Sequence, residues 1–234
     1  MSRLVEIGPE IWIAEGPVVD FYSFPYSTRM VVVRLSSGGL WVWSPIALDA
    51  GLKAEIGALG TPAHLISPNK LHHLFVGEWA AAWPEAKIWA LPSVVKKLRP
   101  LAVSGWLDDT PPQDWASDLD QTVFRGNPLI DEAVFFHRPS KTAIFTDLTE
   151  NFSESFLKTH WHGWKHMIAR LWRITEPYGK APLELRLSWF GKAKGRMALA
   201  KVKGWQPDQI VMAHGEWVRS GAADYLEKSF DWLG

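Results

Sequence analysis

The segment RMVVVRLSSGGLWVWSPI, residues 29–46, constrains the fold more than any other part of the chain. Two runs rich in β-branched and aromatic residues, 29–36 and 40–46, flank a Ser-Gly-Gly turn. Such runs favour β-strands, and a short connection that contains glycine is typical of a hairpin. Together with the strand-like segment 10–16, they predict that the chain begins with an antiparallel sheet.

After the hairpin the pattern changes to an alternation of helices and strands. Helices are predicted over 48–60, about 71–83 and 93–99, and strands over 64–67 and 87–91. The first of these helices is expected to end at Gly60 in a left-handed conformation. The alternation is typical of an α/β layer. Later strands are predicted over 122–126, 132–138, 142–148 and 209–215, and a C-terminal helix over 222–233.

The composition limits the chemistry that is available. The 234 residues include no cysteine, so any metal must be bound by histidine and carboxylate groups. A chain of this length, 47% hydrophobic, can bury one large core, which favours a single domain over residues 1–234. The N-terminus lacks the apolar run of a signal peptide, and no segment approaches the roughly 20 apolar residues that span a bilayer. We therefore expect a soluble cytoplasmic protein.

Charge is unevenly distributed, although the formal net charge is zero. Residues 151–205 carry eleven Lys or Arg and three Glu, a net charge of +8, together with five tryptophans. This segment is predicted to be a helical, Trp-rich basic insertion. It could be a solvated helix face or a cationic wall that binds an anionic substrate. It lacks a recognised nucleic-acid-binding module, which argues against nucleic acid; peripheral membrane contact and homo-oligomerisation stay open.

Several histidines and one aspartate stand at strand ends, where functional groups gather in α/β proteins. His72 and His73 follow a strand and a Pro-Asn turn, Asp147 ends the strand in AIFTDL, and His214 precedes Gly215. Each also has a structural interpretation, as a surface residue, as a group that orients a ligand without binding the ion, or as a turn cap. A separate group in THWHGWKHM has helical ligand spacing, but the tryptophans beside it favour aromatic packing; its members are His160, His162 and His166.

The order of these segments resembles the metallo-β-lactamase-like hydrolase superfamily. The stretches RLSSGGLWVWSPIALD, SPNKLHHLFVGEW and WPEAKIWA are similar to an uncharacterised domain-of-unknown-function branch of it, and the similarity covers most of residues 5–225. The resemblance implies an α/β (α+β) fold. It would be a four-layer αββα sandwich with metals at one rim between the two sheets, and the helical insertion lies at about 151–205.

The resemblance also implies which positions correspond to the family's metal motif, H-x-H-x-D-H. With His73 at the last position of the motif, His72 takes the aspartate position. Lys70 and Pro68 then take the second and first histidine positions. Two ligands of the motif are therefore replaced.

The remaining ligands of the family fall in later segments. Its middle histidine aligns near Gly126-Asn127, so Asn127 replaces it, whereas Asp147 matches the bridging aspartate and His214 the last histidine. All ligands exclusive to the first metal are thus lost. The set that remains for the second metal is His72, His73, Asp147 and His214.

These assignments predict a metal-dependent hydrolase with one divalent ion, which is zinc, iron or manganese. Lys70 or Asn127 would stabilise negative charge on a small-molecule, anionic substrate. Two alternatives stay open. The chain could be a degenerate, non-catalytic member of the fold that binds a ligand or partner without an ion, or an iron protein with redox chemistry.

Overall fold

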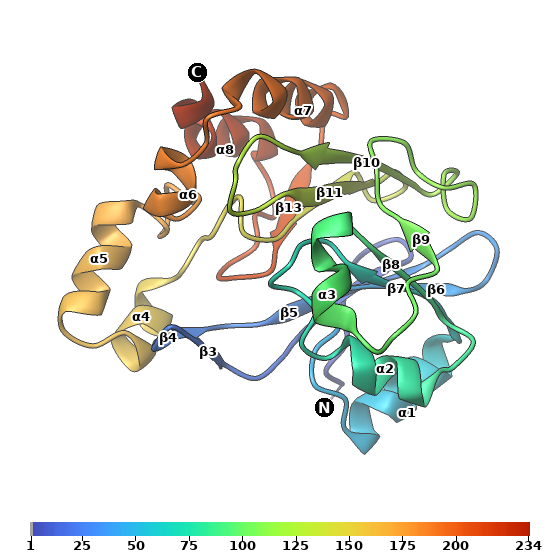
Figure 1. The fold of residues 1–234 in the computed structure, drawn as a ribbon. Coiled ribbons are helices and arrows are strands. Elements are labelled where there is room, and N and C mark those ends of the chain that lie inside the picture. The colour runs from blue at the N-terminus through green and yellow to red at the C-terminus, as the bar shows by residue number, and fades with distance from the viewer. Residues whose placement is uncertain (1) are drawn as a thin grey trace.

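We describe residues 2–234 of a computed structural model, in which the chain forms four layers (Figure 1). Two sheets lie face to face. Helices α7 (Lys192–Gly204) and α8 (Ala222–Ser229) cover the outer face of one sheet, and α1 (Ala50–Leu59) and α2 (Val76–Ala82) cover the other. This is the predicted αββα sandwich.

The first sheet has seven strands and contains the predicted hairpin. In spatial order they are β1 (Val5–Gly8), β2 (Ile11–Glu15), β5 (Arg29–Arg34), β6 (Leu40–Trp43), β7 (Pro62–Ser67), β8 (Lys87–Ala90) and β9 (Gly105–Trp106). Strands β5 and β6 pair antiparallel, and Gly38 in their turn has a φ of 90°, which favours glycine. Strands β6, β7 and β8 pair parallel, as alternation with helices requires. The antiparallel start and the α/β layer are both confirmed.

The second sheet has four strands, each buried on both faces. They are β10 (Leu119–Phe124), β11 (Glu132–His137), β12 (Thr142–Phe145) and β13 (Gln209–Met212). Within β11, Phe135 packs into the core between the sheets, with its ring centroid 4.9 Å from that of Trp41. Val134 points the other way, into the core beneath α7 and α8. Because alternate side chains enter two different cores, the strand reads as a continuous apolar run.

The basic segment 151–205 contains four helices with different surroundings. Helices α4 (Glu154–His160), α5 (Trp164–Trp172) and α6 (Leu183–Leu187) precede α7, which joins the outer layer. Helices α4 and α5 pack instead on a hairpin that the sequence analysis missed, β3 (Val19–Phe21) and β4 (Phe24–Tyr26). The indole Nε1 of Trp161 donates to the Pro25 carbonyl at 2.6 Å. Within residues 2–234, no helix is long and apolar enough to cross a membrane.

Several helix ends differ from the predicted ones, and so does the conformation of Gly60. Helix α1 does end before Gly60, but Gly60 is extended, with φ 162°, rather than left-handed. The helix predicted from about residue 71 begins only at Val76, so the two adjacent histidines lie in an irregular loop. The shorter elements are α3 (Val95–Leu98), which follows a 3₁₀ turn (Pro92–Val94), and a final 3₁₀ turn (Asp231–Leu233).

Candidate metal centre

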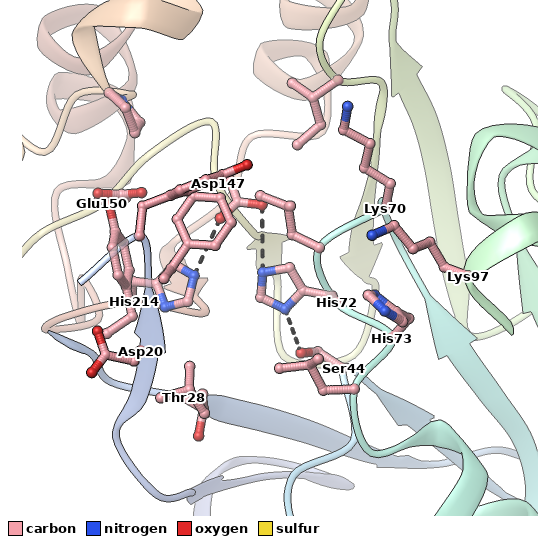
Figure 2. A pocket seen from close by; sticks show the side chains of 18 of the residues that line it. Asp20, Thr28, Ser44, Lys70, His72, His73, Lys97, Asp147, Glu150 and His214 are labelled. Carbon is pink, nitrogen blue, oxygen red and sulfur yellow. Dashed lines mark hydrogen bonds and ion pairs between the residues drawn. The ribbon is translucent and has the colours of Figure 1, made fainter. Parts of the chain in front are cut away.

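Three loops that follow sheet strands bring His72, Asp147 and His214 together. His72 follows β7 of the first sheet, whereas Asp147 and His214 follow β12 and β13 of the second. The Nε2 atom of His214 lies 3.2 Å from Oδ1 of Asp147, and Nε2 of His72 lies 3.4 Å from Oδ2 (Figure 2). One ligand atom from each residue lies within 4.8 Å of the others. Among residues 2–234, this is the only group of three or more His, Asp or Glu side chains whose ligand atoms are close enough to hold one metal ion.

Asn69 explains why the histidine loop is not helical. Its side-chain oxygen accepts hydrogen bonds from the backbone N–H groups of Leu71, at 2.9 Å, and His72, at 3.2 Å. This Asx turn competes with the first turn of a helix. Its side-chain nitrogen donates to Oδ2 of Asp147 at 2.6 Å. A single amide, fully buried, therefore fixes both the loop of His72 and the carboxylate opposite it.

A hydrogen bond at Nδ1 also orients each imidazole. Nδ1 of His72 shares a hydrogen bond of 2.7 Å with the hydroxyl of Ser44, at the end of β6. Nδ1 of His214 lies 2.6 Å from the carbonyl oxygen of Ser27. A carbonyl only accepts, so Nδ1 of His214 carries the proton and donates it. Both rings therefore direct Nε2 toward Asp147, an arrangement typical of histidines that bind metals.

The tautomer of His214 indicates what must lie between its Nε2 atom and the carboxylate of Asp147. With the proton on Nδ1, a neutral ring directs the lone pair of Nε2 at Oδ1 of Asp147, and a carboxylate oxygen only accepts. A positive charge, either a second proton or a metal ion, is needed between the two atoms. The three side chains are arranged so that they could hold a metal ion.

Asp147 is buried beside two imidazoles and the donating amide of Asn69. Burial alone would raise the pKa of its carboxyl, but the neighbouring His72 and His214 hold that pKa well below its usual range. The carboxylate is therefore ionised at neutral pH, as a metal ligand must be.

A second buried carboxylate, Glu132, holds the loop of Asp147 from the other side. Its two oxygens accept the backbone N–H groups of Thr146 at 2.7 Å, Asp147 at 2.8 Å and Leu148 at 3.2 Å. Burial and the charge of Asp147 raise the pKa of Glu132 to about 7. The sequence analysis did not identify this residue. The sequence feature that could have identified it is a charged residue directly before the apolar run AVFF in the strand EAVFFH.

The structure does not bring His73 into the cluster. Consecutive side chains of the loop point in different directions, and the ring of His73 lies away from Asp147 (Figure 2). Its Nδ1 is buried without a hydrogen-bond partner among the described residues. Burial and the nearby Lys97 lower the pKa of His73, so the ring is neutral.

Lys70 and Asn127, both predicted to stabilise charge, are placed differently. Lys70 lines a pocket of about 670 Å³ that also contains the three clustered side chains. Asn127 does not line it, although its amide holds Leu129 and Leu185, which do. The side-chain nitrogen donates to the Leu185 carbonyl at 2.8 Å, and the side-chain oxygen accepts the N–H of Leu129 at 2.7 Å. Asn127 was predicted to stabilise negative charge on the substrate, but its side chain instead holds the backbone of Leu129 and Leu185.

The second histidine group does not converge on a centre. His166 pairs with Glu154 across 3.2 Å, and the His160 ring packs on Phe156, with centroids 4.5 Å apart. His162 is exposed. The aromatic packing predicted for this stretch is seen in Trp161, which is 1% exposed, whereas Trp164 is 59% exposed.

Comparison with known proteins places the chain in a family. Residues 10–161 match the family described as Domain of unknown function (DUF4336). Among curated proteins, none matches the chain.

Many solved structures match this chain, and three of them show how closely the fold agrees. DIM-1 metallo-β-lactamase exposed to ceftazidime has 12% identity over 99% of this chain and 95% of that one, with a TM-score of 0.66. Metallo-β-lactamase FIM-1 from Pseudomonas aeruginosa in the mono-zinc form has 10% identity, coverage of 98% and 93%, and a TM-score of 0.63. The metal-soaked Flv1 flavodiiron core from Synechocystis sp. PCC6803 has 11% identity, coverage of 98% and 60%, and a TM-score of 0.65.

At these identities the structural likeness shows the fold alone, whereas the family match extends over more than half of the chain. The chain therefore belongs to the DUF4336 family and is a divergent protein of the metallo-β-lactamase fold.

Proposed function

We propose that this protein is a metal-dependent hydrolase with one divalent ion, held by His72, Asp147 and His214. The observation that carries the proposal is the convergence of two imidazoles and a carboxylate in one pocket. Ligand atoms about 2.1 Å from a tetrahedral zinc ion are about 3.4 Å apart. The separations of 3.2 and 3.4 Å between the imidazole nitrogens and the Asp147 oxygens fit that geometry.

The donor set fits zinc best, and iron or manganese as alternatives, because it combines imidazole nitrogen with carboxylate oxygen. Three protein ligands leave a coordination position open, which is typical of catalytic rather than structural sites. One related structure, FIM-1, is described as a mono-zinc form. A bound ion would supply Lewis-acid activation of a water molecule and of the scissile carbonyl or phosphoryl group.

The chain's own residues hold and orient the reactants. Ser44 and the Ser27 carbonyl fix the two imidazoles, and Asn69 fixes the carboxylate. Lys70 lines the same pocket, where its ammonium group would stabilise negative charge that develops on the substrate. His73 and Asn127 take no part in the proposed chemistry.

Metal analysis tests the proposal directly. Protein purified without a histidine tag and equilibrated with zinc, manganese or iron is expected to retain about one ion per chain, and His214→Ala to retain none. Carboxylic esters, lactones and phosphate esters are then screened for hydrolysis that a chelator removes and the ion restores. Two ions per chain would contradict the one-ion site. No ion under any condition would overturn the hydrolase proposal and favour a non-catalytic binding protein.

Ser44→Ala is expected to weaken metal binding by about 10- to 100-fold, because the Nδ1 partner of a metal-binding histidine fixes its orientation. Affinity is measured by competition with a chromogenic chelator. Ser140→Ala is the matched control, since Ser140 makes the same 2.7 Å bond to Nδ1 of His137, a residue outside the pocket. Equal affinities of the two variants would refute the positioning role of Ser44.

A further inference from the structure

Glu150 is a buried carboxyl group on one wall of the pocket. It is 1% exposed, and its Oε2 atom has no hydrogen-bond partner among the described residues. The residue nevertheless lines the pocket that contains the proposed metal centre. A buried polar atom without a partner costs free energy, so an unsatisfied group beside an open space is suited to bind a ligand.

The electrostatic surroundings of Glu150 favour a positive ligand group. Burial and the negative charges of Asp147 and Glu184 raise the pKa of Glu150 well above its usual value. The same negative potential that retains a proton on this carboxyl also attracts an ammonium or guanidinium group. Asp20, another acid that lines the pocket, lies on the same side of the centre (Figure 2).

The other side of the pocket is cationic. Lys70 and Lys97 both line it, and they lie across the three clustered side chains from Glu150 (Figure 2). Neither belongs to the lysines that form ion pairs within residues 2–234, which are Lys87, Lys141, Lys180, Lys201 and Lys203. The charge of Lys70 acts on Asp131, but neither lysine forms an ion pair within 4 Å among the described residues, so both are available to an anionic ligand group.

We infer that the pocket binds a dipolar molecule, with a cationic amine or guanidinium group toward Glu150 and a carboxylate or phosphate toward Lys70 and Lys97. The inference rests on the proposed hydrolase function only in placing the scissile group between the two ends, at His72, Asp147 and His214. An amine without an anionic group would leave Lys70 and Lys97 unpaired, and an anion without an amine would leave Oε2 of Glu150 without a partner. Both groups of the ligand therefore contribute to selectivity.

Defined probes test the charge requirement without knowledge of the natural substrate. The probes are ω-amino acids of increasing chain length, with the alkanoate, alkylamine and alkanol of matching length. Binding is measured by calorimetry on both metal-free and zinc-loaded protein. At the best chain length, the ω-amino acid is expected to bind at least about 10-fold more tightly than either singly charged analogue, because each charge-assisted hydrogen bond contributes about that factor. Equal binding of the alkanol would overturn the inference.

Variants assign each end of the probe to a wall. Glu150→Gln is expected to weaken binding of the ω-amino acid and the amine by about 10-fold but to leave the alkanoate unchanged. Lys97→Ala is expected to weaken the ω-amino acid and the alkanoate but not the amine. Lys96→Ala is the matched control, since Lys96 is an exposed neighbour that does not line the pocket. If both variants weaken all probes equally, the assignment of the walls is wrong.

The result is separable from the hydrolase proposal. If no metal binds and no substrate is hydrolysed, the charge selectivity of the metal-free pocket still supports or refutes the dipolar ligand. Conversely, a protein that binds one ion and hydrolyses an ester without any preference for dipolar probes would refute this inference alone.

Discussion

His72→Ala is expected to abolish stoichiometric metal binding, whereas His73→Ala, one residue further along, retains about one ion per chain. Nε2 of His72 lies 3.4 Å from the Asp147 carboxylate, but His73 lies outside the cluster. Loss of a hydrogen-bond partner behind a ligand costs about 10- to 100-fold in metal affinity, so loss of the ligand itself is expected to exceed 100-fold.

The measurement is metal per chain after dialysis against a limiting concentration of free zinc, with circular dichroism to confirm folding. The two variants are matched, because each removes one imidazole from the same loop. Metal loss in His73→Ala with retention in His72→Ala would reverse our assignment. Loss in both would restore the four-ligand set that the sequence predicts.

Glu132→Ala is expected to lower the free energy of unfolding by about 3–5 kcal/mol. The side chain is fully buried and accepts three backbone N–H groups, so its removal leaves three donors without partners as well as a cavity. Each buried unsatisfied donor costs about 1–3 kcal/mol, although relaxation and water entry recover part of the sum.

Urea unfolding followed by tryptophan fluorescence measures this change, and Glu132→Gln separates charge from shape. The amide keeps one acceptor but turns donors toward backbone N–H groups, so we expect an intermediate loss. Glu85→Ala, at an exposed position, is expected to stay within about 0.5 kcal/mol of the unmodified protein. A loss below about 1 kcal/mol in Glu132→Ala would mean that water satisfies the three amides.

Most strands of the two large sheets were predictable because their signal is local, whereas the short edge strands β1 and β9 were not predicted. Alternation and β-branched composition indicate strands whether or not their partners are known, and the Ser-Gly-Gly turn fixes the pairing of β5 with β6. The hairpin of β3 and β4 was missed because its strands have three residues each and Pro25 lies in the second. Its stability comes from helices that follow more than a hundred residues later.

The residues of the candidate site were predictable only where their place at the end of a strand indicates a role. Asp147 and His214 stand at strand ends, which all point to one rim of the sandwich. Which of two adjacent histidines faces that rim depends on the Asx turn at Asn69, a local feature whose direction the sequence does not give. Glu132 and Glu150 act through contacts or cavities formed by distant segments, so their roles emerge only in the folded chain.

The three side chains of the proposed centre come from both sheets. His72 belongs to the first sheet, and Asp147 and His214 belong to the second. An ion bound by all three would join the two halves of the sandwich as a covalent cross-link does, in a chain that has no cysteine to form a disulfide. Binding to the folded state at about 100 times Kd would add roughly 2.7 kcal/mol of stability. The ion would then stabilise the contact between the two sheets as well as take part in catalysis. The stability of the fold would therefore depend on the metal supply.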